Sequence, residues 1–442
     1  MTDWLRMSAA DLGRAIGRQE IDPEALTDAC FRAIAAAPET PRIFARLTEP
    51  RARAEAGAAA RRARAGQRLS LLDGVPLSWK DLFDTAGTAT EAGSRLLEGR
   101  LPDRDARVLR NATARGLVCL GKTHMTELAF SGLGLNPVTA TPPNINDPAR
   151  APGGSSSGAA ASVAFGLAPA AIGSDTGGSV RLPAAWNDLV GLKTTAGRLS
   201  LEGVVPLCDS FDTVGPLCRT VEDAAELLAA LEGGKAADLA GVTLRGRRFM
   251  ILETVAFDDI RPEPLAGFER AIGRMRDAGA EIRRGAVPAL AEAMALAGIL
   301  FTTEAYATWR EAIEAAPDKM YPPVRERFRA GAQHAGADFV AAWRRLRRLR
   351  EDWSEATAAF DAVLVPTVPS LPPVIARLEA ESDYFIAENL LALRNTRIGN
   401  LMGLAGLTLP TGLASTGITL LGRPGQEELL LRLGAAAEAA LA

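Results

Sequence analysis

Ala151-Pro-Gly-Gly-Ser-Ser-Ser-Gly158 and Gly173-Ser-Asp-Thr-Gly-Gly-Ser-Val-Arg181 are the two stretches that decide how this chain is interpreted. They contain two glycine-flanked serines, Ser155 and Ser179, which stand 24 residues apart with an apolar run between them. The glycines at 177 and 178 allow a tight turn in which consecutive backbone N–H groups converge on one point. Because such N–H groups stabilise the oxyanion that forms when a serine attacks a carbonyl carbon, the two stretches favour a serine hydrolase.

A lysine upstream completes this set. Val75-Pro-Leu-Ser-Trp-Lys-Asp-Leu-Phe83 places Lys80 at the end of a strand-like apolar segment. Most lysines in such a place are surface charges, but burial destabilises the ammonium form and can leave a neutral base near pH 7. The chain has only two histidines, His124 and His334, and neither has the neighbourhood of a nucleophile, so both are expected to be structural or exposed. Lysine is therefore the expected base.

The glycine-rich stretches also admit other interpretations. A phosphate-binding loop of the form GxxxxGK[ST] needs a lysine directly after its second glycine, whereas Ala159 follows Gly158 here. A flexible linker is disfavoured because apolar residues follow at once, at positions 163, 165 and 167. A glycine-rich turn from strand to helix without any chemistry stays open for residues 173–181 taken alone.

The pattern of apolar residues predicts an α/β protein with a mixed β-sheet covered by helices on both faces. From Leu71 onward, short apolar runs alternate with helical stretches. The predicted strands cover residues 75–79, 117–121, 167–173, 249–253, 362–365 and 417–421, and the clearest helices cover 105–115 and 157–165. We expect residues 1–442 to form one domain, with an N-terminal helical segment over 1–65 and a helical insertion over 290–360 that could form a lid.

Composition excludes several classes of protein. The chain is 48% hydrophobic and 23% charged with a formal net charge of −3, which gives no reason to expect nucleic acid or a membrane surface as a partner. The four cysteines lack CxxC spacing, so neither a disulfide framework nor a zinc site is indicated. No signal peptide or membrane-spanning run is evident. We expect a cytoplasmic monomer or homodimer that acts on a small molecule without a cofactor or metal.

Lys80, Ser155 and Ser179, in these contexts, resemble the Ser-cisSer-Lys triad of the amidase signature family. The resemblance covers most of the chain and includes five further blocks at 121–132, 191–195, 212–216, 361–367 and 422–425. Two departures concern the loops. Ser157 stands where the family usually has a glycine, and Leu404-Ala-Gly-Leu-Thr-Leu-Pro410 replaces a common Gly-Leu-Pro-Ala.

The resemblance implies a role for each residue of the site. Ser179 would be the nucleophile, and Ser155, preceded by a cis peptide bond, would relay its proton to neutral Lys80. The oxyanion hole would be formed by the backbone N–H groups of Thr176, Gly177, Gly178 and Ser179. Ser156 and Asp175 would support the loops by hydrogen bonds.

The expected reaction is hydrolysis of the C–N bond of a small amide through an acyl-enzyme on Ser179. The resemblance also admits carbamates (urethanes) and esters, because one oxyanion hole serves attack on any carbonyl. The alternative is the glutaminase subunit of a tRNA-dependent amidotransferase, which works inside a complex. A catalytically silent scaffold is disfavoured by the complete triad.

The candidate pocket walls are mostly apolar and comprise Met125, Phe130, Leu133, Trp186, Phe301 and Tyr306. No arginine or acid is clearly placed to hold a zwitterion. We therefore expect turnover of neutral aryl amides or aryl carbamates and weak activity on glutamine. That expectation fails if Arg181, Arg394 or Arg397 points into the pocket, because a buried carboxylate needs a paired cation.

Overall fold

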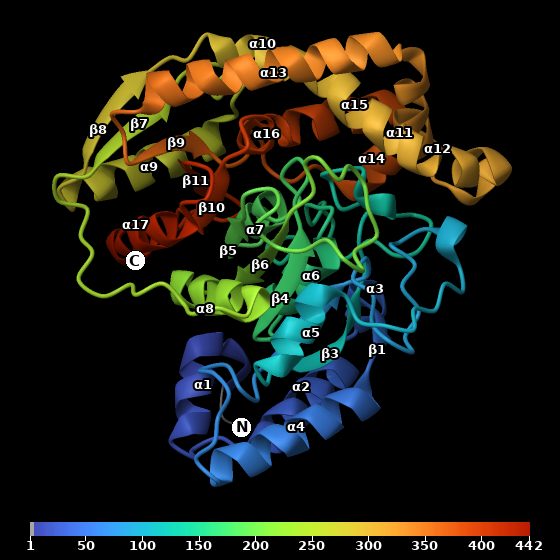
Figure 1. Ribbon diagram of the computed structural model, residues 1–442, viewed down its shortest axis with the longest axis vertical. Helices are drawn as coiled ribbons and strands as arrows, with labels where there is room; N and C mark the ends of the chain where they lie inside the picture. The colour runs from blue at the N-terminus through green and yellow to red at the C-terminus, as the bar shows by residue number, and fades with distance from the viewer. Residues whose placement is uncertain (1–3) are drawn as a thin grey trace.

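A computed structural model describes residues 4–442, which form an α/β structure around one mixed sheet of 11 strands (Figure 1). The strand order is β1-β3-β2-β4-β6-β5-β10-β11-β9-β7-β8. Neighbours run parallel in β3-β2-β4 and in β9-β7-β8, and antiparallel in the other pairs. The strands are β1 (Phe44–Leu47), β2 (Pro76–Lys80), β3 (Val118–Thr123), β4 (Ala170–Ser174), β5 (Val190–Lys193), β6 (Val214–Cys218), β7 (Arg248–Leu252), β8 (Glu281–Gly285), β9 (Ala362–Pro366), β10 (Ala405–Pro410) and β11 (Gly417–Gly422).

Helices precede, connect and follow these strands. They are α1 (Ala9–Gly17), α2 (Pro23–Ala36), α3 (Thr40–Ile43), α4 (Glu49–Arg64), α5 (Arg107–Ala114), α6 (Ser157–Ala164), α7 (Arg181–Trp186), α8 (Val221–Glu232), α9 (Pro262–Asp277), α10 (Ala289–Ala295), α11 (Ala297–Ala315), α12 (Pro322–Arg329), α13 (Gly336–Thr357), α14 (Ile375–Ala380), α15 (Ser382–Ala392), α16 (Arg394–Leu401) and α17 (Glu427–Leu441).

Strand β4 shows how helices cover both faces of the sheet. Successive side chains of a strand point to opposite faces. Ala170 and Ile172 belong to the main apolar core together with Leu227 of α8, whereas Ala171 packs in a separate cluster with side chains of α6 and α7. Helices α6 and α7 therefore lie on one face and α8 on the other. The two loops that carry the candidate serines lead into α6 and α7, on the same face.

The predicted fold class is confirmed, and each of the six predicted strands overlaps an observed one. Five strands were missed, namely β1, β5, β6, β8 and β10. Their sequences carry glycine, proline or charged residues, as in Val-Gly-Pro-Leu-Cys of β6 and Glu-Ile-Arg-Arg-Gly of β8. Hydrogen bonds to neighbouring strands stabilise these segments. Because this pairing does not require an alternation of apolar and polar residues within the segment itself, the sequence of each segment did not reveal a strand.

The N-terminal region departs from the expected helical segment over 1–65. Helix α1 begins as predicted, with Ser8 Oγ accepting the N–H of Asp11 at 3.0 Å. Between α3 and α4, however, residues 44–47 form strand β1, which pairs antiparallel with β3 at the edge of the sheet. A four-residue strand with two partly exposed side chains has too little alternation to be recognised from the sequence alone.

The helical insertion over 290–360 contains α11, α12 and α13, with α10 at its start, and lies along the upper edge of Figure 1. Leu346 and Leu349 of α13 are buried, as predicted for its inward face. Aromatic pairs join the insertion to loops of the core: Phe301 lies 4.4 Å from Phe211, and Phe328 lies 4.6 Å from Phe130, between ring centroids. The insertion is therefore packed directly against the loops that flank the candidate site.

Candidate active site

The sheet brings Lys80 and the loop of Ser179 together. Strands β2 and β4 are parallel neighbours, with Leu77 paired to Ala170, so their carboxyl ends meet at the same edge of the sheet. Lys80 is the last residue of β2, and the loop that contains Ser179 follows β4 directly. The loop that contains Ser155 reaches the same place from the start of α6. The three residues singled out in the sequence thus come from three separate segments.

Lys80 is fully buried and bonded to two serines. Its Nζ donates to Ser155 Oγ at 2.7 Å and to Ser174 Oγ at 2.8 Å. Burial lowers the pKa of Lys80 to about 7, although the charges of Asp212 and Asp175 act in the opposite direction. A large fraction of this lysine is therefore the neutral amine near pH 7. Ser174 stands inside the quoted stretch but was not singled out, because nothing local distinguishes it.

Ser155 and Ser156 tie the two glycine-rich loops together. The Gly154–Ser155 peptide bond is cis. The hydroxyl of Ser156 donates to Ser174 O at 3.2 Å and accepts the N–H of Ser174 at 3.3 Å, while its own N–H donates to Ser179 O at 3.3 Å. These bonds fix the loop before α6 against the loop after β4, and so hold Ser155 and Ser179 at one site.

The turn before Ser179 differs from the expectation in one respect. Gly178 has a positive φ of 138°, and its N–H donates to Asp175 Oδ1 at 2.8 Å. This N–H group is therefore already occupied and is not available to an oxyanion, which corrects its inclusion in the expected oxyanion hole. Within residues 4–442, the N–H groups of Thr176, Gly177 and Ser179 donate to no protein acceptor.

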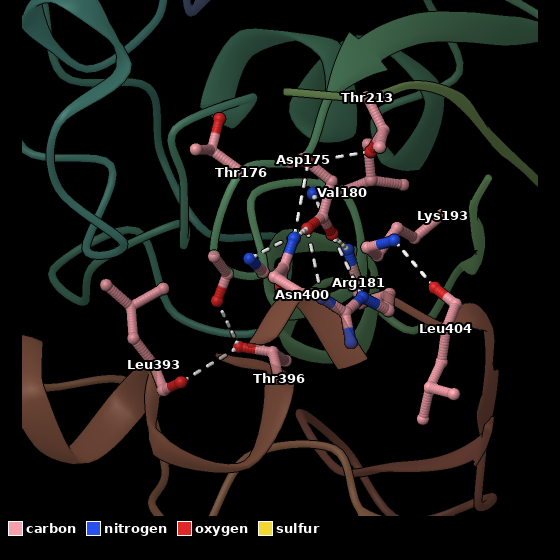
Figure 2. A network of polar contacts seen from close by, with 12 residues as sticks. Asp175, Thr176, Val180, Arg181, Lys193, Thr213, Leu393, Thr396, Asn400 and Leu404 are labelled. Atoms are coloured by element: carbon pink, nitrogen blue, oxygen red, sulfur yellow. Dashed lines mark hydrogen bonds and ion pairs between the residues drawn. The ribbon is translucent and has the colours of Figure 1, made fainter. Parts of the chain in front are cut away.

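Asp175 organises this turn from within the core. Figure 2 shows its carboxylate beside Asn400 and Arg181, which donate to it from Nδ2 at 2.9 Å and from Nη2 at 2.9 Å and Nε at 3.0 Å. Burial by itself would raise the pKa of Asp175, but the charge and hydrogen bonds of Arg181 hold it well below its usual range. Asp175 is thus ionised, and Arg181 is committed to it rather than free to bind a substrate.

Helix α16 supplies further contacts that the sequence did not indicate. Thr396 Oγ1 donates to Gly177 O at 2.8 Å, and Asn400 holds Asp175 (Figure 2). On the other side of the turn, Thr176 Oγ1 is bonded to the buried carboxylate of Asp212, which also accepts the N–H groups of Leu207 and Cys208. These partners lie more than 30 residues from the turn, so only the fold connects them to it.

Ser179 lines a small cavity of about 30 Å³ together with Thr176 and Gly177. A larger cavity of about 500 Å³ adjoins it, bordered by α11, α12 and α15. The two cavities share three lining residues, Phe301, Arg327 and Arg397. The candidate nucleophile therefore stands at the inner end of an open chamber, next to two arginines.

The expected pocket walls are only partly correct. Phe130 and Phe301 line the small cavity, but Met125, Leu133 and Trp186 are fully buried and line neither cavity. Tyr306 points elsewhere and bonds to Glu314. Of the three arginines considered, Arg181 pairs with Asp175 and Arg394 donates to backbone carbonyls, whereas Arg397 does line the cavity, so the pocket is not free of cations.

Clusters of metal-binding side chains and membrane-spanning helices were both sought in residues 4–442. In this range no group of three His, Cys, Asp or Glu side chains is arranged to hold a metal ion. Over the same residues, no helix is both long and apolar enough to cross a membrane.

Comparisons with known proteins agree with one another. A model of the family named Amidase matches residues 25–431. The chain is 37% identical to the 2-amino-5-chloromuconic acid deaminase of Comamonas testosteroni, over 98% of this chain and 96% of that protein. It is 34% identical to a subunit of the glutamyl-tRNA(Gln) amidotransferase of Roseiflexus sp. (strain RS-1), with the same coverage. Among solved structures, an amidase superposes with a TM-score of 0.89 at 31% identity, over 99% of this chain and all of that chain.

Proposed function

Since the chain belongs to the amidase signature family and is an amidase that hydrolyses amide C–N bonds, we propose that Ser179 is its nucleophile and that Ser155 and Lys80 form the proton relay. The observation that carries this proposal is the short contact from Lys80 Nζ to Ser155 Oγ, at 2.7 Å, in a buried site where the amine is partly neutral. A buried neutral amine bonded to a hydroxyl is a competent base for a serine nucleophile.

The proposed acylation step moves two protons along the relay and one electron pair from Ser179 Oγ to the amide carbon. Neutral Lys80 takes the proton of the Ser155 hydroxyl, Ser155 takes the proton of Ser179, and Ser179 Oγ attacks the amide carbon. The free N–H groups of Thr176, Gly177 and Ser179 stabilise the oxyanion, while Asp175 holds the turn through Gly178. As the intermediate collapses, the leaving nitrogen receives the proton by the reverse route. Water then hydrolyses the acyl-enzyme with the same relay.

The geometry admits carbonyl substrates other than amides. Carbamates and esters pass through the same oxyanion, so we propose that small amides are the principal substrates, aryl amides among them, and that urethanase or esterase activity accompanies them. The helical insertion contributes Phe301 and Arg327 to the cavity walls, which supports a role as a lid over the chamber. Cytoplasmic location and function as a monomer or homodimer remain predictions from the sequence.

A second candidate function is the glutaminase subunit of a tRNA-dependent amidotransferase. The 34% identity to the Roseiflexus amidotransferase subunit supports it, as does the presence of arginines in the chamber, because glutamine carries a carboxylate. Purified chain without partner subunits or ATP should be assayed for release of ammonia from simple aliphatic amides. Turnover by the isolated chain supports the hydrolase. Activity that appears only when partner subunits are added supports the glutaminase.

A further inference from the structure

Arg327 of α12 and Arg397 of α16 stand where the small cavity at Ser179 meets the larger chamber, and each lines both. Both side chains are half-buried. Burial lowers the pKa of Arg327 to about 9, with the charge of Arg397 adding to the effect, and lowers the pKa of Arg397 to about 10. Two cations thus lie close together, and no carboxylate among residues 4–442 offsets either of them.

The protein leaves most of their donor groups unused. Arg327 Nη1 donates to Phe130 O at 2.9 Å, and its guanidinium lies over the Phe130 ring at 4.3 Å from the centroid. Across residues 4–442, Arg397 makes no side-chain hydrogen bond or ion pair, and Arg327 makes no ion pair. An arginine carries five N–H donors, so several donors of this pair have no acceptor among residues 4–442. Arg181, by contrast, is fully buried and held by Asp175.

Among residues 4–442, the one acidic side chain that lines the larger cavity already forms ion pairs. Glu326 lines the larger cavity, but it accepts from Arg325 Nε at 2.8 Å and from Arg329 Nη1 at 3.2 Å on the outer side of α12. No acidic residue lines the small cavity among those described. Because unpaired cations are costly to bury, the pair formed by Arg327 and Arg397 is complementary to an anionic ligand.

We propose that Arg327 and Arg397 bind a carboxylate on the acyl part of the substrate, so that the enzyme prefers small monoamides of dicarboxylic acids. The inference rests on the proposed function, since it takes Ser179 as the nucleophile. The acyl part stays on Ser179 while the amine leaves, and the wide apolar chamber gives the amine its exit. Guanidinium groups match a carboxylate in geometry, with paired N–H donors. This replaces the expectation of a neutral substrate.

Three amides with the same five-carbon acyl chain provide the test. Glutaramate carries a terminal carboxylate, valeramide carries a methyl group in its place, and glutamine adds an α-ammonium to glutaramate. We expect kcat/KM for ammonia release from glutaramate to exceed that from valeramide by about tenfold or more, the effect of a charged hydrogen bond. Glutamine should be poorer than glutaramate, because the small cavity offers its ammonium no acid among the residues described. Equal or better turnover of valeramide overturns the inference.

Variants connect the preference to the two arginines. Arg397→Gln and Arg327→Gln should each lower kcat/KM for glutaramate by about 10- to 100-fold and change that for valeramide by less than about threefold. Arg397→Lys should restore part of the loss. Arg329→Gln is the matched control, because that arginine lies on α12 and pairs with Glu314 outside the cavity. Equal losses on both substrates would contradict a carboxylate site.

A binding measurement tests the carboxylate site independently of the proposed catalytic mechanism. Glutarate should raise the melting temperature of Ser179→Ala, and the added Arg397→Gln change should remove that shift. Stabilisation by glutarate without turnover of any amide would keep the anion site and reject the hydrolase. Turnover of amides without a preference for glutaramate, and without stabilisation by glutarate, would reject the anion site alone.

Discussion

Lys80 Nζ lies 2.7 Å from Ser155 Oγ, inside a protein core that excludes the solvent needed to stabilise an ammonium ion. The contact joins the end of β2 to a loop 75 residues further along the chain. The Ser155 hydroxyl thus lies between the buried amine of Lys80 and the loop that contains Ser179. The reaction and the stability of the site should therefore depend on this contact and on the turn beside it.

Replacement of Ser179 by alanine should abolish hydrolysis without unfolding the protein. The side chain makes no hydrogen bond within residues 4–442, so its loss removes the nucleophile and little else. Removal of a covalent nucleophile lowers kcat by several powers of ten, roughly 10⁴-fold or more. Steady-state kinetics of the purified variant, with circular dichroism to check its fold, measures this. Substantial activity in a clean preparation would show that another group attacks the substrate.

Lys80→Ala and Ser155→Ala should be strongly non-additive. Each breaks the same relay, so the double variant should be about as slow as the slower single variant. The coupling comes from comparing kcat of the wild type, both single variants and the double variant. Rate losses that simply multiply would mean that the two residues act independently, against the relay.

The pH dependence of the reaction should report Lys80. The base must be neutral, and the pKa of Lys80 is lowered to about 7, so kcat/KM should rise with pH below about 7 and level off above it. Valeramide is the suitable substrate, since it does not titrate in this range. A profile that falls between pH 6 and pH 8 would contradict a lysine base.

Gly178→Ala and Gly177→Ala should behave differently although they are neighbours. A Cβ at Gly178 would lie 2.0 Å from Thr396 Oγ1, on a backbone with φ of 138°. A Cβ at Gly177 would meet no atom within 4 Å. We expect Gly178→Ala to cost roughly 2 kcal/mol or more of unfolding free energy and to impair catalysis, and Gly177→Ala to retain the melting temperature. Similar thermal stability of the two variants would show that the loop relaxes freely.

Asp175→Asn should weaken both the fold and the reaction. It leaves the fully buried Arg181 without its ionic partner, which typically costs about 3–5 kcal/mol. Asp147→Asn is the control, because Asp147 pairs with Arg150 in a solvent-exposed bridge worth about 1 kcal/mol or less. Urea denaturation followed by tryptophan fluorescence compares them. Equal effects would mean that the buried pair is not important for stability.

Much of the candidate site was predictable because it is encoded locally. The sequence around Ser179 predicts a strand followed by a glycine-rich turn and a short helix. The sequence around Ser155 likewise predicts a glycine-rich loop that leads into helix α6. The strands with continuous apolar runs, such as β4 and β9, were found for the same reason. Strands β5, β6 and β8 were not, since hydrogen bonds from neighbouring strands stabilise them despite their glycine, proline or charged residues.

The sequence by itself determined the α/β class and the class of reaction, and it singled out the residues of the proposed triad, because each depends on a short pattern of residue types. Only the tertiary structure decided that the N–H of Gly178 donates to Asp175, that Thr396 and Asn400 hold the turn by hydrogen bonds, and that Arg327 and Arg397 line the same cavity as Ser179. These contacts join segments up to 225 residues apart. A local pattern fixes the path of its own backbone, but which distant side chains converge on a cavity depends on how the helices pack onto the sheet.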